Sequence, residues 1–157
     1  MTPTIYLTQF SVTRPTFCGV GARYGIVALP RRWEQADGTV TILQAQRGHE
    51  VDLLRAALNA RRKTTDRNTP EMAAYKAALE ARWTEQAARG LLDPGRLSAV
   101  RWRDEATLHP LQGGETLCCS CSVEEANAGR CHRAWAAPFL VRAGWRVVLD
   151  GQEVTLD

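Results

Sequence analysis

The sequence lacks the segments that mark membrane and exported proteins. Its longest uncharged apolar run is far shorter than the roughly 20 residues that a membrane-spanning helix needs. The N-terminal stretch MTPTIYLTQF also lacks the basic and then apolar layout of a signal peptide. Internal repeats and low-complexity tracts are missing as well. We therefore expect a cytoplasmic protein with no membrane partner.

A strong excess of one charge is missing too. The formal net charge is +3, and only two of the 20 basic residues are lysine, Lys63 and Lys76. A genome rich in G and C produces such an arginine bias without any ligand. We therefore favour genome composition over nucleic-acid binding as the origin of the bias. The sequence does not require a nucleic-acid partner, and it does not determine the oligomeric state.

Cysteine is scarce outside one segment. Four of the five cysteines lie between residues 115 and 131, directly before His132. Because an odd number of cysteines without an export signal would stay reduced in the cytosol, a disulfide framework is the least favoured origin of this cluster. A reactive thiolate, a metal site, or a buried strand that packs small sulfur side chains would each account for it.

Hydrophobic periodicity predicts alternating strands and helices in one domain over residues 1–157, and the 45% apolar content is enough for a core. The strands are expected at residues 4–10, 24–30, 39–46, 115–121 and 145–156, and the helices at 49–63, 70–89, just after 93 and at 131–144. This order predicts an α/β fold: a single three-layer domain with a mostly parallel, Rossmann-like sheet and helices on both of its faces.

Cap and turn residues predict where some of these elements begin and end. Thr69 and Pro70 stand at the N-cap and first position of one helix, and Gly90 should end that helix. Asp150 and Gly151 form the Asp-Gly signal of a tight turn between two strands.

The predicted site is the cysteine-rich strand, loop and helix at residues 115–144. Cys131 is expected at the start of the helix, where unpaired N–H groups and the helix dipole favour a thiolate. Charge from His132 and Arg133 would favour the thiolate further and would suit an anionic substrate group. We therefore expect Cys131, His132 and Arg133 to be catalytic, with ordinary packing of Cys131 as the alternative.

Three further residues are expected to bind the ligand. Arg130 flanks Cys131, and Ser122 follows the cysteine strand at its carboxyl end, where ligands of parallel sheets gather. Trp33, after the second strand, could line a pocket for a planar ligand, although burial against the sheet is the more common role. The expected ligand is a small anion with phosphate- or nucleotide-like chemistry.

Zinc binding is the rival hypothesis for the cluster. Cys119 and Cys121 are two apart on a strand and point to the same face, so both could reach one ion. Cys131, with His132, would then complete a Cys₃His set. The spacing C-x-C-x9-C-H is not a common zinc-finger pattern. Under this hypothesis the protein is a non-enzymatic, zinc-stabilised interaction module.

The stretches TLCCSC and GRCHRAW resemble a family known as domain of unknown function 488, found in bacteria and their phages. Its members carry Leu-Leu-Cys on a strand and Cys-His-Arg at the start of the next helix. The resemblance implies an α/β fold, no established reaction, and a site in which Cys118 joins Cys131, His132 and Arg133. The extra cysteines leave open whether Cys118 or Cys119 is the matching residue. A second uncharacterised family has Cys-x-Cys followed by Cys-His, and against that pattern Cys119, Cys121, Cys131 and His132 would align instead.

Overall fold

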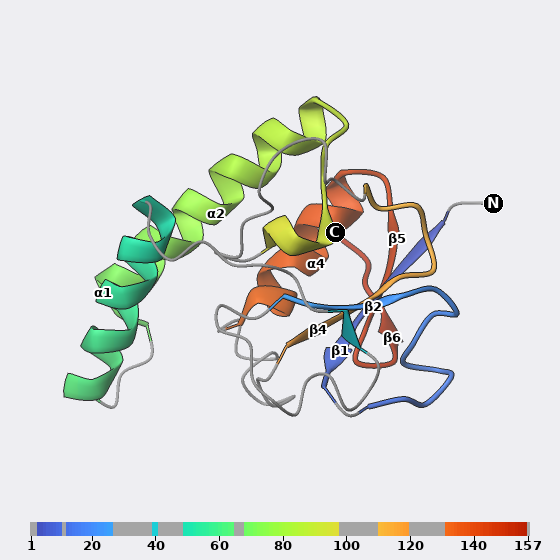
Figure 1. Cartoon of the computed structure of the whole chain (residues 1–157), viewed down its shortest axis with the longest axis horizontal. Coiled ribbons are helices and arrows are strands. Elements are labelled where there is room, and N and C mark those ends of the chain that lie inside the picture. Colours follow the sequence, from blue (N-terminus) through green and yellow to red (C-terminus); the bar gives the residue numbers. More distant parts are fainter. Residues whose placement is uncertain are drawn as a thin grey trace.

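The computed structural model describes residues 3–10, 12–26, 39–40, 49–64, 68–97, 110–119 and 131–156. Its centre is a six-stranded sheet with the strand order β3-β2-β4-β1-β5-β6 (Figure 1). Neighbouring strands from β3 to β5 are parallel, and β6 is antiparallel to β5. The strands are β1 (Thr4–Gln9), β2 (Arg23–Gly25), β3 (Thr39–Val40), β4 (Thr116–Cys119), β5 (Arg146–Leu149) and β6 (Gln152–Glu153).

The prediction of an α/β fold with a mostly parallel sheet is confirmed. The cysteine-bearing strand β4 lies inside the sheet, between β2 and β1. The helices are α1 (His49–Lys63), α2 (Pro70–Ala88), the 3-10 helix η2 (Pro94–Leu97) and α4 (His132–Arg142). None of the helices in the described part of the chain combines the length and apolar character that crossing a bilayer requires.

The predicted caps and the predicted turn are also found. The Thr69 side chain accepts a hydrogen bond from the backbone N–H of Met72, and Gly90 follows the end of α2 with φ +68°. Asp150 and Gly151 both have positive φ, 48° and 85°, as a tight turn between two antiparallel strands requires. These local signals therefore gave correct positions.

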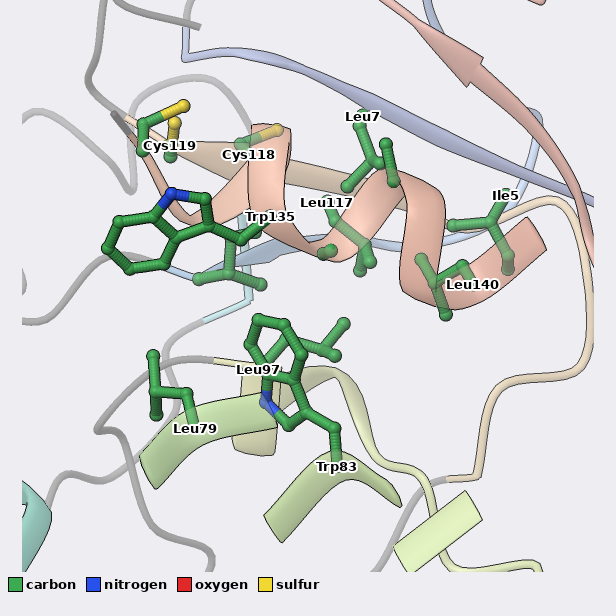
Figure 2. Packing of buried hydrophobic residues seen from close by; sticks show 14 of the residues in the cluster. Ile5, Leu7, Leu79, Trp83, Leu97, Leu117, Cys118, Cys119, Trp135 and Leu140 are labelled. Atoms are coloured by element: carbon green, nitrogen blue, oxygen red, sulfur yellow. The ribbon is translucent and has the colours of Figure 1, made fainter. Parts of the chain in front are cut away.

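Helix α4 covers the face of the sheet on which Ile5 and Leu7 lie. Both side chains are fully buried, and so are their register partners Val147 and Leu117. Figure 2 shows Ile5 and Leu117 close to Leu140 of α4, which is fully buried as well. This face forms the main core.

Helix α2 extends that core. Its Trp83 packs against Phe139 of α4 with ring centroids 5.5 Å apart. Figure 2 shows Leu79 and Trp83 of α2 beside Leu97 of η2. In Figure 1, α1 and α2 pack against each other and form the part of the molecule farthest from the sheet.

In the part of the chain that the structure describes, a loop rather than a helix lies against the other face of β1. Tyr6 points to that face, because side chains alternate along a strand. Residues 12–22 run beside it, and the N–H of Gly21 donates to the carbonyl of Gly114 at 2.9 Å. Gly19 approaches Gly114 so closely that a Cβ would collide with its carbonyl oxygen. Among the described residues, helices are thus seen on one face of the sheet.

Candidate functional site

The carboxyl end of β4 and the start of α4 meet at a buried guanidinium. Arg133 is in the first turn of α4, and its side chain is 0% exposed. Its Nη1 donates to the Cys119 sulfur at 2.7 Å. Its Nε donates to Asp150 Oδ2 at 3.3 Å, and its Nη2 lies 3.2 Å from the same oxygen. Arg133 therefore joins a strand end, a helix start and the β5–β6 turn.

The charge of Arg133 is kept despite its burial. Burial alone would lower the pKa of the guanidinium, but the sulfurs of Cys119 and Cys131 and the carboxylate of Asp150 together raise it. By reciprocity, a permanently charged guanidinium favours the thiolate form of a neighbouring cysteine. Arg133 is thus the cation of the site, and the sulfur that it contacts is that of Cys119.

Cys131 lies at the start of α4, as the sequence predicts. It is the N-cap residue with extended backbone angles, φ −140° and ψ 163°, and its side chain makes no capping hydrogen bond. Its exposed fraction is 2%, and that of Cys119 is 1%. Both thiols are therefore covered in this structure. A reagent or ligand can reach them only when the residues that cover the carboxyl end of β4 and the start of α4 move aside.

His132 does not supply the positive charge that the sequence analysis assigns to it. Burial, with a smaller contribution from the Arg82 charge, lowers the pKa of His132 to about 4, although the Cys119 sulfur acts in the opposite direction. The imidazole is therefore neutral at pH 7. Its Nε2 lies 2.7 Å from the Tyr75 hydroxyl, and its ring packs against Trp135 with centroids 5.3 Å apart.

Cys118 and Cys119 have different surroundings. Both are buried, but neighbours on a strand point to opposite faces. Cys119 lies within reach of Arg133, whereas Cys118 shares its face with its register partners Thr8 and Gly25. Of these two cysteines, Cys119 is therefore the one that contacts the cation of the site.

The zinc set cannot be assembled from the described residues alone. Within the described ranges, which omit residues 120–130, there is no group of three or more His, Cys, Asp or Glu side chains able to hold a metal ion. Cys121 lies outside these ranges, and so do Arg130, Ser122 and Trp33. Their predicted metal and ligand roles therefore stay predictions.

Two residues of this network were not predicted as site residues. Asp150 appears in the sequence only as a turn residue, and Tyr75 only as one member of an apolar helix stripe. The structure brings Asp150 to Arg133 and Tyr75 to His132. The sequence contained one hint that Asp150 is more than a turn residue. Asparagine or glycine would fill this turn position equally well, yet the residue there is charged.

A cleft of about 570 Å³ lies elsewhere, at the amino ends of β1 and β4. Tyr6 and Cys18 line it, and the Nη1 of Arg23 donates to the Cys18 sulfur at 3.1 Å. Cys18 is partly exposed, unlike the other cysteines in the described ranges. The cleft is thus separate from the Cys119 site at the carboxyl ends of the strands.

Comparison of the chain with protein-family models, with curated proteins and with solved structures finds no match.

Proposed function

We propose that this chain is a small cytosolic α/β protein, a cysteine-dependent enzyme or binding domain, that takes a small anionic molecule at the carboxyl end of β4. The expected ligand chemistry is phosphate- or nucleotide-like. The observation that carries this proposal is the 2.7 Å contact between Arg133 Nη1 and Cys119 Sγ. The Arg133 guanidinium is a buried cation next to this sulfur, and a neighbouring cation favours the thiolate, which is the reactive form of cysteine.

The start of α4 supports the anionic ligand. The first N–H groups of an α-helix have no partner within the helix, and its dipole attracts negative charge. Helix α4 has 11 residues, and Cys131 does not cap it with its side chain. Because Asp150 and Cys119 already balance Arg133, we assign anion binding mainly to these N–H groups. The resemblance of Cys131, His132 and Arg133 to the Cys-His-Arg motif of the domain of unknown function 488 family agrees with a site here.

Competition between alkylation and inorganic phosphate tests the proposal. The folded protein is treated with iodoacetate, which is anionic, or with neutral iodoacetamide, and mass spectrometry of peptides gives the rate at each cysteine. We expect iodoacetate to be favoured at Cys119 relative to Cys18, and phosphate to slow the reaction at Cys119 alone. Cys18 is a matched internal control because it also contacts a guanidinium, that of Arg23, but does not lie at the start of an α-helix.

Two results would contradict the proposal. The first is the same preference between the two reagents at Cys119 and Cys18. The second is an alkylation rate at Cys119 that phosphate slows no more than it slows the rate at Cys18.

A further inference from the structure

Asp150 lies outside the cysteine-rich segment, 17 positions after Arg133, yet it contacts the same guanidinium. Its Oδ2 accepts from Nε and lies beside Nη2, on one edge of the planar group. The remaining terminal nitrogen, Nη1, reaches the Cys119 sulfur. The carboxylate and the sulfur thus hold different edges of one rigid cation.

We propose that Asp150 is a positioning residue, which holds Arg133 so that Nη1 points at the Cys119 sulfur. The N–H groups of a guanidinium form a fixed planar fork, so holding the Nε and Nη2 edge also fixes the direction of Nη1. The Arg133 side chain is 0% exposed, so bulk water does not compete for it. This inference rests on the proposed role of Cys119 as the thiolate of the site.

Asp150 is itself held from three sides. Its N–H donates to the carbonyl of Leu7 at 2.9 Å, and its Oδ1 accepts from the Thr8 hydroxyl at 3.3 Å. Its backbone is fixed in the tight turn with φ 48°. The carboxylate therefore has a defined place relative to β1, which is the neighbour of β4 in the sheet.

The turn does not require this carboxylate. A position with positive φ in such a turn accepts asparagine or glycine at least as well as aspartate. An aspartate in the turn has a distinct use here because its charge balances a buried arginine. Two substitutions at Asp150 can therefore keep the turn and change only what the side chain offers to Arg133.

The test compares Asp150→Asn with Asp150→Gly. Asparagine keeps an acceptor oxygen for Arg133, whereas glycine keeps none. The probe is neutral iodoacetamide without any added anion, and the measured quantity is the alkylation rate at Cys119 divided by the rate at Cys118. Cys118 is buried on the same strand, so this ratio corrects for a general opening of the core.

A positioning role predicts that Asp150→Gly lowers the ratio by about tenfold, because an ordinary thiol is only a few per cent thiolate near pH 7. Asp150→Asn should lower it less. A purely electrostatic role predicts instead that both substitutions raise the ratio, because each removes negative charge near the thiolate. A raised or unchanged ratio in Asp150→Gly would overturn the proposal.

Thr8→Val is the second variant, for the case that Asp150→Gly does not fold. It removes only the hydroxyl that holds Asp150 Oδ1 and keeps a β-branched side chain in β1. Because Thr8 is the register partner of Cys118, the rate at Cys119 is in this variant divided by the rate at Cys18. A lower ratio is expected, and an unchanged ratio would overturn the proposal. Glu153→Gln is the matched control. It removes a carboxylate from the same hairpin, where Glu153 pairs with Arg146 in an exposed ion pair, and should leave the ratio unchanged.

The two proposals fail separately. If phosphate does not protect Cys119 but Asp150→Gly still lowers the ratio, anion binding is refuted and the positioning role is retained. If phosphate protects Cys119 and the ratio does not respond to Asp150→Gly, the positioning role is refuted alone.

Discussion

Replacing Arg133 with methionine removes the cation of the buried network and keeps an unbranched side chain. The change leaves the Asp150 carboxylate, 9% exposed, and the Cys119 sulfur without their cationic partner. Breaking a buried ion pair by removing one partner costs about 3–5 kcal/mol. The free energy of unfolding of a whole domain is only about 5–15 kcal/mol. We therefore expect Arg133→Met to remove a large fraction of the stability.

Urea unfolding followed by tryptophan fluorescence measures this loss, because Trp83 and Trp135 are both buried in the core. The double variant Arg133→Met with Asp150→Asn should recover part of it, since the carboxylate charge is then gone and Cys119 can take up a proton to become a neutral thiol. The coupling between the two sites should reach about 1–3 kcal/mol. A loss below about 1 kcal/mol in Arg133→Met is typical of an exposed pair and would refute the argument from burial.

Acidification from pH 6.5 towards pH 4 should lower the urea midpoint. The pKa of His132 is about 4 in the folded state and 6.5 for the free side chain, so the unfolded chain takes up the proton first and is stabilised relative to the folded protein. An equal fall in His132→Gln would contradict this assignment. Cys131→Ser should keep the melting temperature or raise the stability by up to about 1 kcal/mol, because serine is a preferred N-cap. A loss of several kcal/mol would indicate a zinc ligand instead. Thiol titration of denatured protein, purified without oxygen, should find all five cysteines free, because the cytosolic location that we propose would keep thiols reduced. A lower count without bound metal would indicate a disulfide.

Features that depend on neighbouring residues could be predicted from the sequence. The helix from Cys131 was predicted from the mainly apolar segment that Gly144 ends, and the cap at Thr69 follows from the side chain and the proline after it. The turn at Asp150 follows from the next residue, a glycine that accepts positive φ. Each of these signals acts within a few positions, so one sequence contains all of it.

The connections within the site depend on distant residues, and for this reason the sequence did not reveal them. The choice between Cys118 and Cys119 requires the face of β4 that α4 covers, which the pattern of two adjacent cysteines does not encode. The role of Asp150 requires the packing of the last hairpin against β1. The neutral state of His132 requires its burial beside Tyr75, whereas the sequence shows only a histidine next to arginine.

The hydrogen bond between Thr8 and Asp150 joins residues 142 positions apart. Such non-local contacts form slowly, because a long loop must close before the contact stabilises anything. During synthesis Cys119 and Arg133 leave the ribosome before Asp150 does, so a nascent chain cannot yet hold its arginine in place. We expect the thiol to acquire its final reactivity only after the β5–β6 hairpin has docked beside β1, which ties the chemistry of the site to the completion of the sheet.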